Sequence, residues 1–291
     1  MTRLRSFALR HRRAIWLAVA SLSAIWAVFS PAGALETLRN LAIFVVVFGL
    51  IVGIHEFCHL LAARALGVRV LAFGLGFGPR IVARRKFGIE WQLRALPLGG
   101  YVKLSGEESD EGPDSFAAAS AKKRILILLA GPLSNLVLAF LLICGMAVAM
   151  GLSIERAPEA AFQIIAMIID QTINSITAFL PVAGARPLDL PMVGIPGMIG
   201  AVGTMLAIGP YMLVILAAAM SLSLGLMNLL PIPPLDGGQA AMIGLKALLG
   251  RYFPTRAAVA FARVSFSAIV LLMLIINGLD LYRTIIGYLP H

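Results

Sequence analysis

The sequence is poor in charge and in cysteine. Only 13% of its 291 residues are charged, whereas 60% are hydrophobic and the mean hydropathy is +0.93. About 25% of the residues of soluble domains are charged, so this composition excludes an ordinary soluble domain. The two cysteines, Cys58 and Cys144, are too few for a disulfide framework and are predicted near opposite ends of their helices, too far apart to pair.

Acidic residues are also scarce, at 14 against 24 basic residues, which gives a net charge of +10. The basic residues gather between apolar runs: five lie in residues 1–13, eleven between Arg64 and Arg124, and four between Lys246 and Arg263. This distribution is typical of the cytoplasmic segments of membrane proteins. We therefore expect a lipid bilayer, and no nucleic acid, as the surroundings of the chain.

Apolar runs predict an all-α polytopic membrane protein with four or five transmembrane helices. The runs cover residues 14–35, 40–55 with a continuation to Ala63, 125–154, about 207–230 and about 257–279. Residues 190–206 are rich in glycine and proline, and we expect an irregular or re-entrant approach there. If the three basic groups lie in the cytoplasm, the spans alternate consistently.

Residues 1–35 have a basic start, an apolar middle and an "AGA" ending. Both a cleaved signal peptide and an additional span fit this pattern, and we favour a retained span. Residues 36–291 are predicted to form the core of the protein, whichever of the two is right.

Two regions between the spans differ from them. Residues 68–115 form a predicted re-entrant β region, because the β-branched runs of 68–104, separated by glycine and proline, indicate three or four short strands in a small membrane-associated sheet. Residues 155–206 are predicted to lie on the outer side, and 158–179 have the spacing of an amphipathic helix. That helix either gates substrate entry or anchors the chain at the interface.

The motif H-E-x-x-H occurs at His55, Glu56 and His59, inside an apolar run. Residues four apart share a face of a helix, so the two histidines can bind one zinc ion while Glu56 acts as the base for a bound water. Alternatively, the histidines only hydrogen-bond across a helix bundle and Glu56 pairs with Arg64. We favour the metal site because ionisable groups inside membranes are generally functional.

A catalytic zinc ion usually has three protein ligands. Since His11 and His291 lie at the chain ends, we expect a carboxylate as the third ligand. Asp236 in "NLLPIPPLDGG" is the first charge after a long apolar run, although a solvated turn also fits this segment. Cys58 is a rival ligand, but its position points away from the face of the two histidines.

The motifs "HEFCH", "GPLSN" and "NLLPIPPLDGG", with "PLGGYVKLSGE" after the first, resemble the site-2 protease family of intramembrane zinc metalloproteases, in particular its bacterial RseP-like branch. The resemblance covers about residue 40 to the C-terminus. It implies zinc bound by His55, His59 and Asp236, with Glu56 as the catalytic base. The resemblance also implies substrate-binding roles, which fall on Asn135, Asn228, Pro231 and Pro233.

The resemblance implies an intramembrane protease of the bacterial inner membrane that cuts single-spanning transmembrane substrates near the cytoplasmic side, such as anti-sigma factors or signal-peptide remnants. Bacterial relatives carry PDZ domains between two of the spans, for which residues 155–206 leave no room, by natural absence or by removal. The rivals are a metal carrier or sensor and an H-E-x-x-H membrane protease acting on soluble or prenylated substrates. The sequence does not indicate the oligomeric state.

Overall fold

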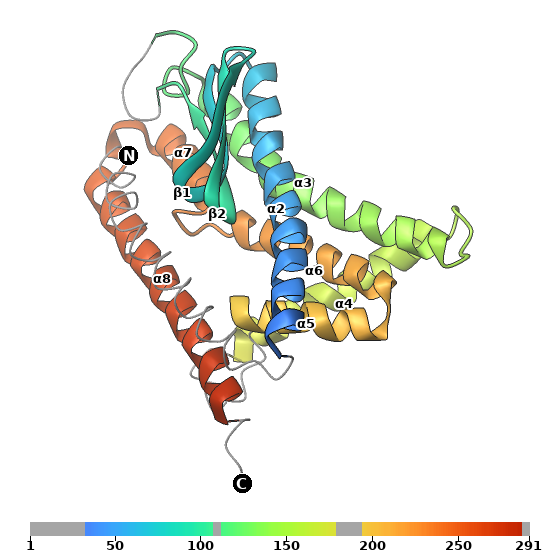
Figure 1. Cartoon of the computed structure of the whole chain (residues 1–291). Helices are drawn as coiled ribbons and strands as arrows, with labels where there is room; N and C mark the ends of the chain where they lie inside the picture. Colours follow the sequence, from blue (N-terminus) through green and yellow to red (C-terminus); the bar gives the residue numbers. More distant parts are fainter. Residues whose placement is uncertain (1–32, 107–111, 179–193, 287–291) are drawn as a thin grey trace. The chain divides into compact units, whose positions relative to one another are not determined.

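The computed structural model describes residues 33–106, 112–178 and 194–286 (Figure 1). The elements run in the order α2 (Gly33–Ala65), β1 (Val70–Lys86), β2 (Ile89–Leu104), α3 (Ala121–Ala149), α4 (Ala157–Ala178), α5 (Ile195–Ile208), α6 (Pro210–Leu229), α7 (Asp236–Leu249), η3 (Gly250–Tyr252) and α8 (Thr255–Ile286). Four described helices are long and apolar enough to cross a membrane: Leu35–Ala65, Ala121–Ala149, Pro210–Leu229 and Thr255–Arg283. The predicted fold class is confirmed. The fifth predicted span, residues 14–35, lies almost wholly outside the described residues.

The described residues divide into two compact units. Unit 1 contains residues 47–106, 112–137 and 224–268, and therefore the sheet, α7 and parts of α2, α3, α6 and α8. Unit 2 contains residues 33–46, 138–178, 194–223 and 269–286. All residues of the predicted metal site belong to unit 1.

The sheet of unit 1 consists of two long antiparallel strands, β1 and β2, and one segment of β1 pairs with two different segments of β2. Residues 72–75 of β1 have Cα partners in 90–93 and also in 100–103, whereas residues 80–86 of β1 have partners only in 89–94. Gly76 and Gly78 have φ angles of +83° and +84° and fall where the register shifts, so they bend β1 without ending it. The predicted small sheet of short strand segments is confirmed, and the glycines that suggested breaks form bulges that join neighbouring segments into two long strands.

An apolar cluster holds this sheet against the helices of unit 1. It combines Leu60 and Ala63 of α2, Phe73 of β1, Ile89 of β2 and Ile127 of α3, all buried. Figure 1 shows the two strands running beside the C-terminal half of α2. Because His59 directly precedes Leu60 and His55 lies one turn before His59, the cluster fixes the sheet next to the histidines of the motif.

In unit 2 a helix is present where the amphipathic one was predicted, as α4, while its location on the outer side stays a prediction. Of the two alternatives for residues 190–206, an irregular chain is wrong from Ile195 onwards, where α5 begins, and a re-entrant course stays a prediction. Pro196 lies in the first turn of α5, where a missing N–H is tolerated. Gly203 faces Asn40 of α2 so closely that a Cβ atom would collide with the amide. Pro196 is therefore compatible with the start of the helix, and Gly203 is required by the packing of the helix against α2.

Helix α5 begins at a polar contact with α8 in unit 2. Asp280, buried in α8, accepts hydrogen bonds from the backbone N–H groups of Gly194 (2.7 Å) and Gly197 (3.1 Å). Asn277 accepts one from Ile195 N–H at 3.1 Å. Side chains of α8 thereby satisfy the donors at the start of α5, which have no partner within their own helix.

Candidate metal centre

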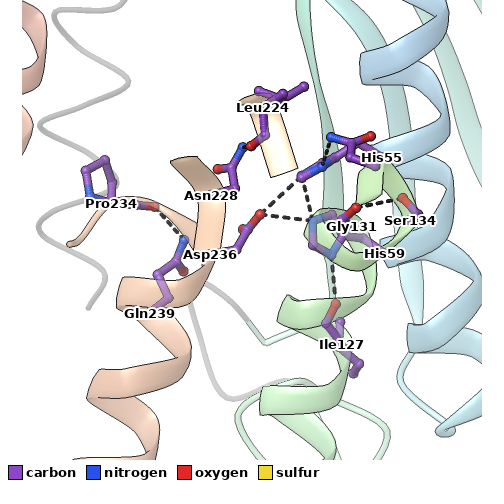
Figure 2. Close-up of polar contacts among 11 residues, drawn as sticks. His55, His59, Ile127, Gly131, Ser134, Leu224, Asn228, Pro234, Asp236 and Gln239 are labelled. Atoms are coloured by element: carbon purple, nitrogen blue, oxygen red, sulfur yellow. Dashed lines mark hydrogen bonds and ion pairs between the residues drawn. The ribbon is translucent and has the colours of Figure 1, made fainter. Parts of the chain in front are cut away.

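Two helices of unit 1 bring together the three predicted metal ligands. His55 and His59 lie four residues apart on α2, and Asp236 is the first residue of α7, 181 positions after His55. The Nε2 atoms of the histidines are 3.1 Å apart, and Asp236 Oδ2 lies 3.1 Å from His55 Nε2 and 3.3 Å from His59 Nε2. Figure 2 shows the carboxylate pointing at both imidazoles.

These spacings fit a tetrahedral metal ion. Ligand atoms 2.0–2.1 Å from a tetrahedral zinc ion lie about 3.3 Å from one another, and the three observed separations are 3.1, 3.1 and 3.3 Å. Two imidazole nitrogens with lone pairs facing each other at this distance repel unless a cation or a proton lies between them. The group is therefore positioned to bind zinc through three protein ligands.

The outer side of each imidazole is held by α3. His59 Nδ1 lies 2.7 Å from Ile127 O, and a carbonyl only accepts hydrogen bonds, so Nδ1 carries the hydrogen and Nε2 keeps its lone pair for the metal. His55 Nδ1 lies 3.1 Å from Nδ2 of fully buried Asn135. When His55 Nε2 binds a metal, Nδ1 carries the hydrogen, so the side-chain amide must turn over and place Oδ1 there to accept it.

Asp236 reaches this position because the first turn of α7 packs tightly against the backbone of the segment that precedes it. A Cβ atom on Gly237 would lie 2.8 Å from Leu230 O, and one on Gly238 would lie 2.6 Å from Ile232 O. Burial raises the pKa of Asp236, but hydrogen bonds from His55 and His59 and the positive charge of these imidazoles, both present when the rings are protonated at Nε2, outweigh it and lower the pKa to about 2. The carboxylate is thus ionised at neutral pH, as a metal ligand must be.

Glu56 follows His55 on α2 and lies against the sheet. A Cβ atom on Gly100 would come within 2.7 Å of Glu56 Cγ and within 3.3 Å of Val52 Cγ1. The last segment of β2 therefore passes directly along the side chain predicted to be the catalytic base. That role itself stays a prediction.

The other predicted residues are less closely connected to the centre. Asn228 donates a hydrogen bond from Nδ2 to Leu224 O within α6 at 3.0 Å, as Figure 2 shows. Pro231 is exposed and Pro233 is buried in the segment leading to Asp236. Among the described residues, none of these three shares a hydrogen bond with His55 or His59. Their proposed substrate contacts stay predictions, as does that of Asn135.

Sequence reasoning did not find two parts of the site. Ile127 acts through its backbone oxygen, so no side-chain pattern identifies it. Gly131 belongs to "GPLSN", but that motif drew attention only to its asparagine. Its position, directly beside His59 in Figure 2, is an outcome of packing between α2 and α3.

Comparison with known sequences places this site in a family. The profile described as peptidase family M50 matches residues 43–273, more than half of the chain. The chain belongs to peptidase family M50. This is the family of the site-2 proteases, so the resemblance noted from the motifs is confirmed.

Bacterial proteins named "putative zinc metalloprotease" are similar to this M50 family member. One from Clostridium acetobutylicum is 36% identical over 116 residues, one from Campylobacter jejuni 46% over 105, and one from Neisseria meningitidis 42% over 110. The matches cover 34–40% of this chain and 25–34% of the relatives. The chain thus spans about a third or less of the length of the curated relatives it matches.

Proposed function

We propose that the protein is a zinc-dependent endopeptidase that hydrolyses peptide bonds within transmembrane helices. The convergence of His55 Nε2, His59 Nε2 and Asp236 Oδ2 within 3.3 Å of one another carries the proposal. Two of these ligands lie in the C-terminal third of an apolar helix long enough to span a membrane. Such a centre is costly in an apolar environment unless it has a function there.

The residues of the chain then have distinct roles. Zinc, when bound, polarises the scissile carbonyl and lowers the pKa of water. Glu56 takes a proton from the attacking water as the new C–O bond forms, and delivers a proton to the amine nitrogen as the C–N bond breaks. Ile127 O and Asn135 keep the two imidazoles oriented during these steps.

The proposed substrates are single-spanning transmembrane segments, such as those of anti-sigma factors or signal-peptide remnants. Their backbone amides are occupied by helical hydrogen bonds, so a substrate must unwind before hydrolysis. Residues 100–104 of β2 form an edge segment that has partners only in β1 and begins beside Glu56. An unwound substrate can add to this edge as an extended strand.

We place the centre near the cytoplasmic side of the bacterial inner membrane. Eleven of the 24 basic residues lie between Arg64 and Arg124, from the end of α2 to the first turn of α3. Cytoplasmic segments of membrane proteins carry such an excess. The bacterial origin of the similar proteins agrees with this location.

The decisive experiment is cleavage of a panel of single-spanning helices reconstituted with the protein in liposomes. We compare the native chain with Glu56→Gln and with a chelator-treated sample. The native chain should cleave, whereas Glu56→Gln should bind zinc and lose about 10²- to 10⁴-fold in rate, the usual contribution of a general base. Equal cleavage by both proteins would refute the proposal, and zinc flux without cleavage would indicate a metal carrier.

A further inference from the structure

One face of α3 lies against both imidazoles of the metal centre. Ile127, Gly131 and Asn135 follow each other at intervals of four residues, which places them on the same side of a helix. Ile127 O contacts His59 Nδ1 at 2.7 Å, and Asn135 contacts His55 Nδ1 at 3.1 Å. Gly131 is the residue between these two contacts.

Gly131 occupies a position where no side chain fits. A Cβ atom there would lie 2.7 Å from His55 Nε2 and closer still to His59 Nε2, the two atoms that face Asp236. Carbon atoms are not found this close to nitrogen without a bond, so an imidazole would have to move. Gly131 lies inside a helix and has no positive φ angle, so space rather than backbone conformation requires glycine.

Neither the rings nor the helix can readily retreat. Hydrogen bonds at Nδ1 hold each ring on its outer side. On another side of α3, a Cβ atom on Gly225 of α6 would lie 2.9 Å from Pro132 O and 3.1 Å from Asn135 Cβ, which shows how closely α6 supports α3. Close-packed interiors transmit such a collision instead of absorbing it.

We propose that Gly131 is a positioning residue for the metal: it leaves the space in which the two Nε2 atoms converge, and any side chain there opens the ligand set. The inference rests on the metal centre of the proposed function and not on the substrate. Failure of cleavage by a zinc-loaded native protein would refute the peptidase but leave this inference standing.

The test is Gly131→Ala, with Gly145→Ala as the matched control, in the purified full chain in detergent. Gly145 lies on the same helix, and a Cβ atom there has nothing within 4 Å. Both changes have the same effect on helix propensity, so a difference between them reports the site. The readouts are zinc affinity, the visible absorption of the cobalt-substituted protein, and helical content.

We expect Gly145→Ala to bind zinc as the native protein does and Gly131→Ala to bind at least about 100-fold more weakly, beyond the usual effect of changing a group that orients a ligand. The cobalt spectrum should lose its tetrahedral signature in Gly131→Ala alone. Native affinity and spectrum in Gly131→Ala would overturn the inference.

A loss of folding in Gly131→Ala has its own test. If the added methyl group collides with the two imidazoles, the triple variant Gly131→Ala, His55→Ala, His59→Ala should regain the helical content and melting temperature of the double variant His55→Ala, His59→Ala. Should the triple variant remain unfolded while the double variant folds, the collision is not with these rings and the inference is wrong.

Discussion

Removal of the Asp236 carboxylate is the most direct perturbation of the metal centre. Oδ2 of this residue is the only atom of the three-ligand group that comes from α7, at 3.1 and 3.3 Å from the two Nε2 atoms. Asp236→Ala removes that atom and leaves the contacts of His55 with Asn135 and of His59 with Ile127 in place. The change thus converts a three-ligand site into a two-ligand site with both imidazoles still oriented.

The expected loss follows from the number of ligands. Zinc sites with four protein ligands bind with about 10–16 kcal/mol, or about 2.5–4 kcal/mol for each ligand. Since about 1.4 kcal/mol corresponds to a factor of ten, Asp236→Ala should weaken zinc binding by about 10²- to 10³-fold. The assay is a zinc titration of the purified chain in competition with a chelator of known affinity.

Asp114→Ala is the matched control. This aspartate also belongs to unit 1 and forms an ion pair with Arg69 at 3.3 Å, but its side chain is 46% exposed and it lies outside the metal group. An exposed pair contributes little, so the control should keep native zinc affinity. If Asp236→Ala binds zinc as tightly as the control, Asp236 is not a ligand. The motif would then indicate an H-E-x-x-H membrane protease whose third ligand is a downstream glutamate.

Three further changes separate the parts of the proposal. Gly100→Ala places a methyl group against Glu56 Cγ and should lower cleavage about 10- to 100-fold, as small misplacements of catalytic groups do, with zinc content unchanged. Lys103→Pro disturbs the edge of β2 beside the site and should lower cleavage with zinc retained, whereas Ala83→Pro on the opposite edge should not. Asp280→Leu leaves two N–H groups at the start of α5 without their acceptor, at about 1–3 kcal/mol each, and should lower the melting temperature.

Each of these predictions has an outcome that contradicts it. Gly49→Ala is the control for Gly100→Ala, because a Cβ atom at Gly49 has nothing within 4 Å, and equal rates would show that Glu56 tolerates the methyl group. Parallel loss of zinc and cleavage in Lys103→Pro would indicate misfolding instead of impaired substrate addition. If Asp280→Leu melts at the same temperature as the exposed variant Asp170→Leu, the hydrogen bonds between Asp280 of α8 and the start of α5 do not stabilise the protein.

The parts of the site that the sequence predicted depend on local or compositional rules. His55 and His59 had to share a face because they are four residues apart on one helix. Asp236 was found because a carboxylate directly after a long uncharged run is rare in such a chain, and the structure brings it within 3.1 Å of His55. The transmembrane helices could also be predicted from the sequence, because each consists of one apolar run.

What the sequence did not predict depends on packing between distant segments. Glycine can break a strand, bend it, or permit a close approach, and the letters "GLGFG" do not distinguish these outcomes. In β1 the bends at Gly76 and Gly78 keep one strand continuous, and in α5 Gly203 serves contact with Asn40. The backbone oxygen of Ile127 has no sequence signature at all, since every residue carries one.

The contacts on the far side of the imidazoles explain how the ligand atoms stay converged. Two Nε2 atoms 3.1 Å apart repel when both carry lone pairs, and a free ring would rotate to separate them. Rotation here would break the contact of His59 with Ile127 O or that of His55 with Asn135, and a buried polar group left without a partner costs about 1–3 kcal/mol. The protein therefore orients the ligands through α3 as much as through the helix that carries the motif.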